Sequence, residues 1–87
     1  MSEPVSRGRA ELLREQGERI TQARNAAGLL QPQLAAAAGA SVRSVSRWET
    51  GQSDPCLRDL ELIAQATGHD LRWLRLGDYR CRRGISQ

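Results

Sequence analysis

Apolar residues recur every three or four positions along most of the chain, which is the spacing of helices that bury one face. The pattern starts at residue 11 and is interrupted by glycines, which end many helices because they adopt the left-handed backbone without steric cost. No alternating strand pattern and no internal repeat appears in the sequence. We therefore predict an all-α fold of five short helices, over residues 11–26 or 18–26, 31–38, 42–49, 55–67 and 71–76.

Capping residues and a proline help to place the helix starts. Pro32 lies in the first turn of the second helix, where its missing N–H would have no partner within the helix. Ser41, Asp54 and Asp70 each carry a side-chain oxygen that can accept a hydrogen bond from the free N–H groups of a helix start. We predict these three residues as the N-caps of the third, fourth and fifth helices, and Gly17 leaves two possible starts for the first.

The two ends of the chain differ in composition from its middle. Residues 1–10 contain a proline, a glycine and few apolar side chains, which is typical of a flexible arm. Residues 11–77 hold the periodic pattern and form one predicted domain. Residues 78–87 include three arginines and are predicted to be a basic, disordered tail. The arginines of arm and tail would either add contacts to phosphate groups of a partner or remain solvated.

The charge balance favours a polyanionic partner. The 87 residues carry 13 arginines and no lysine against 10 acidic residues, which gives a net charge of +3. Arginine binds guanine edges and phosphate oxygens through two parallel hydrogen bonds, although codon bias would also enrich it, and a merely soluble basic protein is the alternative. A chain of this length buries only about 60% of its unfolded surface, so we expect its function to lie on the surface.

Other function classes find no support in the sequence. No apolar run approaches the roughly 18 residues of a membrane span and no signal peptide is apparent, so we expect a cytoplasmic protein. Cys56 and Cys81 lie far apart with only His69 as a possible third ligand, which supports neither a metal site nor a disulfide. Because there is one histidine and no paired carboxylates stand out, we predict neither an enzyme nor a cofactor.

The most informative segment runs from residue 28 to residue 51. Its first half holds a glycine–leucine pair (Gly28 and Leu29) before Gln31, followed by a leucine–alanine pair (Leu34 and Ala35). Its second half holds a turn glycine, Gly39, a serine that opens the next helix, Ser41, and a Trp-Glu-Thr-Gly end at residues 48–51. This arrangement resembles the helix-turn-helix of phage repressor and Cro proteins, the Xre-like family, over about residues 17–77. The resemblance implies a compact five-helix, lambda-repressor-like domain that binds double-stranded DNA.

The third helix of such a domain enters the major groove. Helical spacing puts Val45 and Trp48 on one face, so the opposite face carries Arg43, Ser46 and Arg47. By comparison with the family, the residues that contact bases are Val42, Arg43, Ser46 and Arg47. An arginine there would bind a guanine, and a valine would contact a thymine methyl group. The alternative is an exposed helix face that is only solvated.

The family also implies roles for residues outside this base-contacting set. Gln31 and Ser44 would bind backbone phosphates, and Gln31 would be helped by the positive end of the helix dipole. An ordinary polar helix start is the alternative for Gln31. Arg24 and Glu49 occupy the positions of a structural ion pair in the family.

Four positions depart from the family pattern. Leu30 replaces the Ser, Thr or Asn that usually caps the second helix, which gives up about 1 kcal/mol. Ala38 and Ala40 replace larger apolar residues, so we expect loose packing of the second helix unless another side chain fills the space. Cys56 stands where a Ser or Thr often caps the fourth helix, and this is a further reason to assign that cap to Asp54.

These residues predict a transcriptional repressor or autoregulator. Related proteins bind as two-fold dimers to half-sites roughly 34 to 36 Å apart, so we expect a homodimer on an inverted-repeat operator. The candidate dimer residues are Leu62, Trp73 and Leu76, which would otherwise belong to the core. The alternative function is that of a protein-binding module, such as an antitoxin whose surface or tail masks a toxin.

Overall fold

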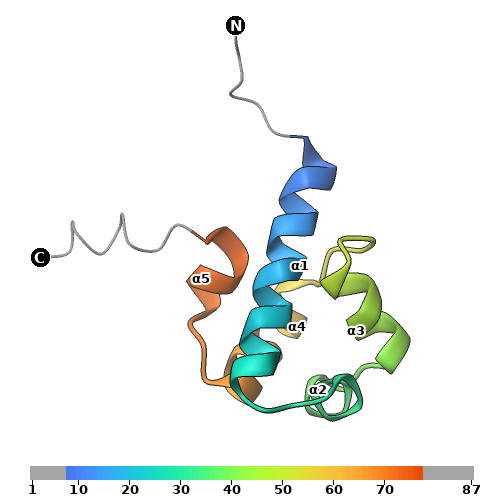
Figure 1. The fold of residues 1–87 in the computed structure, drawn as a ribbon, viewed down its shortest axis with the longest axis vertical. Helices are drawn as coiled ribbons and strands as arrows, with labels where there is room; N and C mark the ends of the chain where they lie inside the picture. Colours follow the sequence, from blue (N-terminus) through green and yellow to red (C-terminus); the bar gives the residue numbers. More distant parts are fainter. Residues whose placement is uncertain (1–7, 78–87) are drawn as a thin grey trace, which may run out of the picture.

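Five α-helices form the part of the chain that the computed structural model describes, residues 8–77 (Figure 1). In chain order they are α1 (Arg9–Ala26), α2 (Gln31–Ala38), α3 (Val42–Glu49), α4 (Leu57–Thr67) and α5 (Leu71–Leu76). The predicted all-α, five-helix fold is confirmed, and α2, α3 and α5 have the predicted bounds. Most of the predicted arm and the whole of the predicted tail lie outside the described residues. Among residues 8–77, no helix has the length and apolar character needed to cross a lipid bilayer.

Two of the three predicted N-caps are present. The side chain of Ser41 accepts a hydrogen bond from the backbone N–H of Ser44 at 3.1 Å, at the start of α3. The carboxylate of Asp70 accepts from the backbone N–H of Trp73 at 3.3 Å, at the start of α5. Each contact satisfies a backbone donor that has no partner within its helix.

The predicted cap of α4 is wrong. The helix begins at Leu57 rather than at residue 55, and its N-cap residue, Cys56, makes no side-chain hydrogen bond. The carboxylate of Asp54 instead faces α1, where Gln16 donates to it at 3.4 Å and the guanidinium of Arg9 lies 3.6 Å away. Because two groups of α1 engage this carboxylate, it ties the loop to α1 rather than capping α4.

The first helix is longer than either predicted version, since it begins at Arg9 and passes through Gly17 without a break. A glycine weakens an isolated helix. Here, however, Gly17 is buried against α3, and a Cβ at this position would lie 2.4 Å from the carbonyl oxygen of Trp48 and 2.6 Å from that of Glu49. The glycine therefore allows close contact between α1 and the end of α3 rather than marking a helix boundary.

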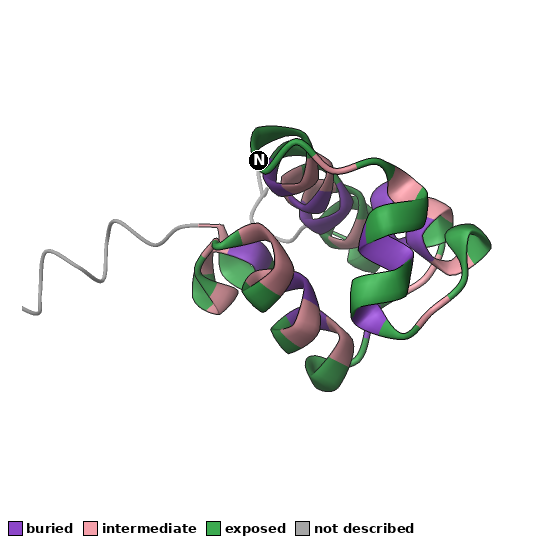
Figure 2. Cartoon of the chain, turned by 90° about the horizontal axis from the view of Figure 1, so that it is seen from below, coloured by how far each residue is buried: buried purple, intermediate pink, exposed green. Residues whose placement is uncertain are grey.

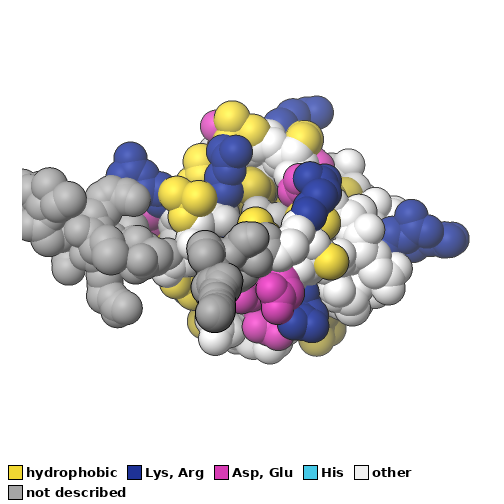
Figure 3. Space-filling model, turned by 90° about the horizontal axis from the view of Figure 1, so that it is seen from above, with side chains coloured by type: hydrophobic (Ala, Val, Ile, Leu, Met, Phe, Trp, Pro, Cys, Tyr) yellow, Lys and Arg dark blue, Asp and Glu magenta, His cyan; other side chains and the backbone are white. Residues whose placement is uncertain are grey.

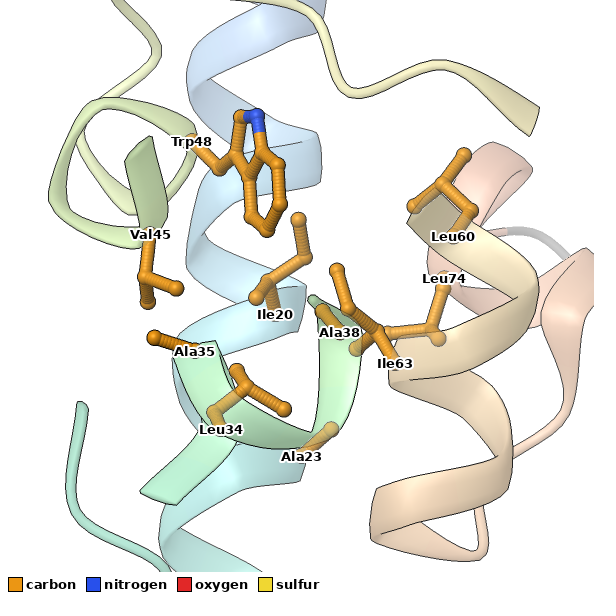
Figure 4. Close-up of a cluster of buried hydrophobic side chains, with 10 residues drawn as sticks. All are labelled: Ile20, Ala23, Leu34, Ala35, Ala38, Val45, Trp48, Leu60, Ile63 and Leu74. Carbon is orange, nitrogen blue, oxygen red and sulfur yellow. The ribbon is translucent and has the colours of Figure 1, made fainter. Parts of the chain in front are cut away.

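Buried apolar side chains from all five helices form one core (Figure 4). Its members are Ile20, Ala23, Leu34, Ala35, Ala38, Val45, Trp48, Leu60, Ile63 and Leu74. In Figure 2 the buried residues lie on the sides of the helices that face one another, and the exposed residues face outward. Ala38 is itself buried, Ala40 packs against the cluster, and Trp48 reaches into it from α3. This shared core holds α3 at a defined orientation on the body of the molecule.

The last helix is attached to the first by one arginine. Nε of Arg19 donates to the carbonyl oxygen of Leu74 at 3.1 Å, and Nη2 donates to that of Arg75 at 3.0 Å. A cation at the C-terminal end of a helix satisfies unpaired carbonyl groups and interacts favourably with the helix dipole. Arg19 therefore holds α5 on α1.

Candidate nucleic-acid interface

A tight turn joins α2 to α3. Gly39 ends α2 in the left-handed region with φ 66°, a backbone conformation that other residues rarely adopt. The N–H of Ala40 then donates to the carbonyl oxygen of Ala35 at 2.9 Å, and Ser41 opens α3. Only residues 39–41 therefore separate two helices of eight residues each.

One face of α3 is buried and the other meets solvent. Val45 is fully buried and Trp48 is 6% exposed, so these two residues anchor the helix to the core. Of the four predicted base-contacting residues, Arg43, Ser46 and Arg47 lie on the opposite side, and Val42 lies at the N-terminal end of the helix. Three of the four are exposed, while Ser46 is half-buried. The structure thus brings three of the predicted base-contacting residues together on one outward face, with Val42 at its N-terminal end.

The two arginines of this face are not engaged by acidic groups. Within residues 8–77, neither Arg43 nor Arg47 makes an ion pair or a side-chain hydrogen bond. Their spacing of four residues places them one turn apart on the same side of the helix. Two guanidinium groups with unengaged donors are therefore available to guanine edges or phosphate oxygens.

Ser44 takes part in the cap of α3. Besides the backbone contact with Ser41, the hydroxyl of Ser41 donates to the hydroxyl of Ser44 at 3.1 Å. Because Ser44 accepts in this bond, its own O–H remains a donor. The cap and the predicted phosphate contact are therefore compatible at this residue.

A buried polar cluster on the inner side of α3 connects α1, α2 and α3. Nε and Nη2 of Arg24 donate to Oε2 and Oε1 of Glu49 at 2.6 and 3.2 Å, and Nε2 of Gln31 donates to Oε1 at 3.0 Å. Nη1 of Arg24 also donates to the carbonyl oxygen of Leu29 at 3.0 Å. The side chains of Arg24 and Glu49 are only 13% and 6% exposed, so each charge depends on the other for compensation. The pair implied by the family resemblance is present, and Gln31 joins it.

The sequence interpretation missed two contacts at the start of α2. It considered Gln31 as a phosphate contact or an ordinary polar helix start, whereas this side chain contacts Glu49, 18 residues away, and no local pattern indicates that contact. It also treated the helix as uncapped, whereas Oε1 of Gln33 accepts from the N–H of Leu30 at 2.8 Å. A glutamine three residues after the N-cap is one half of a capping box, so this second contact did have a sequence signal.

The three predicted dimer residues differ in exposure. Leu62 and Trp73 are half-buried and pack against the core, whereas Leu76 is 57% exposed. Leu76 shares a groove with Leu12 and Leu57, which are also exposed and which come from α1 and the start of α4. Figure 3, which looks onto the end of the molecule where α1 begins, shows hydrophobic side chains gathered beside arginines. Exposed apolar groups with polar neighbours are typical of interaction surfaces.

Of the three side chains considered as metal ligands, Cys56 and His69 lie within the described residues. Cys56 is exposed and free, and Cys81 lies outside the described residues. The ring of His69 lies beside that of Trp73, with 5.3 Å between ring centroids, and its Nδ1 is 3.2 Å from the carbonyl oxygen of Thr67. Within residues 8–77, no three His, Cys, Asp or Glu side chains are grouped to hold a metal ion.

Comparison with known proteins agrees with this geometry. A family model with the description Helix-turn-helix, HTH_3, matches residues 20–74, which include α2, the turn and α3. The chain belongs to this helix-turn-helix family. The proposed resemblance to Xre/Cro-type proteins and the lambda-repressor-like fold are thereby confirmed.

The helix-turn-helix protein is also similar to a solved structure, that of the restriction-modification controller protein C.AhdI from Aeromonas hydrophila. The two sequences are 32% identical, the match covers 75% of this chain and 97% of the other, and the TM-score is 0.67. A search of curated proteins finds no match. The protein is thus a helix-turn-helix DNA-binding domain that resembles a controller protein.

Proposed function

We propose that this protein is a transcriptional regulator, acting as a repressor or autoregulator, that binds an inverted-repeat operator as a homodimer with α3 in the major groove. One observation carries the proposal: Arg43 and Arg47 lie exposed on the outer face of a helix whose inner face is fixed in the core, and no side chain of residues 8–77 engages them. A major groove about 12 Å wide admits such a helix. Acting on DNA, the protein would work in the cytoplasm.

Each outward residue of α3 has a chemistry suited to base edges. Arg43 and Arg47 can each bind O6 and N7 of a guanine, which discriminates against other bases by about 1 to 3 kcal/mol. Val42 offers methyl groups to a thymine methyl, and Ser46 offers a hydroxyl that can donate or accept. We propose these four residues as the base contacts.

Two further residues are proposed as phosphate contacts. Gln31 and Ser44 lie in the first turns of α2 and α3, where free backbone N–H groups and the helix dipole favour an anion. Such contacts set the register of the protein on the duplex and carry no base preference themselves.

The similarity to C.AhdI supports a regulatory role over an enzymatic one. That protein is described as a restriction-modification controller, and its match extends over nearly its whole length. DNA-binding regulators of this family are typically not enzymes. We therefore propose control of transcription, without catalysis or cofactor, as the function of this chain.

Dimerisation is proposed because a single domain of this size covers only about half of a two-fold operator. Among Leu62, Trp73 and Leu76, we place Leu76 at the centre of the contact, since it is the most exposed of the three. Leu62 and Trp73 are half-buried and pack against the core, so they would contribute less surface to the contact. An isologous contact of this kind presents the same patch on both subunits.

Selection of preferred duplexes from a random pool tests the function directly. We expect an inverted repeat with half-site centres one helical turn apart, and about tenfold weaker binding to it for Arg43→Ala or Arg47→Ala. Arg72→Ala, which removes an exposed arginine of α5, is the matched control and should bind as the native chain does. Unchanged sequence preference in both α3 variants would contradict the assignment.

A protein-binding role, such as that of an antitoxin, is the second candidate. The groove that contains Leu12, Leu57 and Leu76 is the observation that favours it, because three exposed leucines there offer an apolar surface to a partner. Co-purification of a second small protein with the native chain, and its loss on Leu57→Asp, would support this role. Recovery of the chain alone under those conditions would argue against it.

A further inference from the structure

Glu49 is held at the end of α3 by two other helices. It is the last residue of α3, and its carboxylate receives three donors: two from Arg24 on α1 and one from Gln31 on α2. The ion pair with Arg24 accounts for charge compensation. The bond from the neutral amide of Gln31 is a separate contact with a different geometric effect.

That contact ties the two helices of the helix-turn-helix at their far ends. The turn at residues 39–41 connects the C-terminal end of α2 to the N-terminal end of α3. Gln31 is the first residue of α2 and Glu49 the last of α3, so their hydrogen bond, 3.0 Å long, links the two ends that the turn leaves apart. A pair of helices joined at one end can change its crossing angle, whereas a pair joined at both ends is restrained.

The crossing angle affects the residues of α3 unequally. A helix of eight residues is about 12 Å long, so a rotation of about 5° around the turn displaces its far end by about 1 Å. Arg47 lies near that far end, while Val42 and Arg43 lie beside the turn. Hydrogen bonds to base edges lose strength over displacements of this size.

We propose that Gln31 is a positioning residue: through Glu49 it sets the angle of α3 to α2 and thereby sharpens the base preference at the operator position that Arg47 contacts. This inference rests on the proposed function, because it takes α3 to be the helix that contacts bases. It differs from the phosphate contact proposed for the same side chain, which would strengthen binding to every duplex alike.

The test compares base-preference profiles selected from a random duplex pool. Gln31→Met keeps the length of the side chain and removes its donor. Gln33→Met makes the same change at a glutamine whose side chain, among residues 8–77, hydrogen-bonds only to the N–H of Leu30. Arg47→Ala first identifies the operator position that depends on Arg47. We expect Gln31→Met to lower preference at that position by five- to tenfold and to affect the position assigned to Arg43 less, whereas Gln33→Met preserves both.

Two results would overturn the proposal. Equal weakening of selected and scrambled duplexes by Gln31→Met would indicate a phosphate contact only, and a profile identical to the native one would indicate no role in positioning. If Gln31→Met only destabilised the fold, binding to the selected and the scrambled duplex would fall equally. Base preference at the single operator position of Arg47 therefore distinguishes positioning of α3 from a general loss of stability.

Hydrogen exchange without DNA provides the second measurement. In Gln31→Met we expect the backbone amides of residues 47–51 to exchange about tenfold faster relative to those of α4, with no such difference in Gln33→Met. Unchanged exchange would overturn the proposal whatever the binding data. If the native chain selects no duplex, the proposed function fails and the inference fails with it, while faster exchange would still confirm that Gln31 restrains α3.

Discussion

At the scale of single residues, Gly17 and Glu49 stabilise the protein although a glycine within a helix and a buried carboxylate are usually destabilising. Gly17 is a helix-weakening residue in the middle of α1, yet its missing side chain is what lets α1 approach the carbonyl groups at the end of α3. Glu49 is a carboxylate in a largely dry environment, where only its partners make the charge tolerable. Both residues act on the same end of α3.

We expect Gly17→Ala to destabilise the protein by about 2 to 3 kcal/mol, although alanine favours helices by about 1 kcal/mol over glycine. The added methyl group would meet the backbone oxygens of Trp48 and Glu49, which belong to a helix and cannot move alone. Urea unfolding measures the change. Glu18→Ala, at the exposed neighbouring position, is the control and should stay within about 0.5 kcal/mol of the native chain.

Removing one partner of the Arg24–Glu49 pair is expected to cost more stability than removing both. Arg24→Met alone should lower the free energy of unfolding by about 3 to 5 kcal/mol, because it strands a buried carboxylate. The double variant Arg24→Met with Glu49→Met should recover much of that loss in thermal or urea unfolding. Arg9→Met, which breaks the exposed pair with Asp54, should change stability by less than about 1 kcal/mol. Equal losses of unfolding free energy in Arg24→Met and Arg9→Met would refute the role of burial.

At the scale of helices, the capping of α2 and α3 differs. Ser41 caps α3 with its side chain, whereas the N-cap of α2 is Leu30, whose side chain cannot accept a hydrogen bond and is 64% exposed. Gln33 compensates in part by accepting from the N–H of Leu30. One half of a capping box is therefore present at α2, and the other half is missing.

Completing that capping box should stabilise the protein. Leu30 has the extended backbone of an N-cap, with φ −93° and ψ 163°, so Leu30→Ser can bring its hydroxyl to the N–H of Gln33. In the native chain that N–H donates to the carbonyl oxygen of Leu30 at 3.0 Å, and a serine hydroxyl would add a second acceptor for it. We expect a gain of about 1 kcal/mol in the free energy of unfolding, measured with urea. Leu30→Ala removes the same apolar surface without adding an acceptor, and a gain of equal size in that variant would show that capping is not the cause.

At the scale of the whole molecule, two surfaces on separate parts of the fold have different characters. The outer face of α3 carries exposed arginines that no group of residues 8–77 engages, and these suit a polyanion. The groove between the start of α1, the start of α4 and the end of α5 carries exposed leucines, which suit another protein surface. Arg19 holds α5 in place on α1 and so positions the apolar surface relative to the rest of the body.

If the groove is the dimer contact, Leu76→Glu should weaken self-association by at least tenfold, because it places a charge in an apolar interface at its centre. Sedimentation equilibrium over a range of concentrations measures the change. Leu30→Glu introduces the same charge at an equally exposed leucine away from the groove and should leave self-association unchanged. A native chain that remains monomeric at high concentration would disprove the proposed dimer itself.

The local features of this protein could be predicted from its amino-acid pattern alone. Periodic apolar residues, a turn glycine and two capping side chains are short-range signals, and they predicted the bounds of α2, α3 and α5 correctly. They also indicated Arg43 and Arg47, which are exposed on α3, as candidate base contacts. The features that depend on distant neighbours emerged only from the packing of the helices: the continuation of α1 through Gly17, the contact of Asp54 with α1, and the hydrogen bond from Gln31 to Glu49. In each of these a packed partner competes with a local preference, and the identity of that partner becomes known only when the helices are assembled.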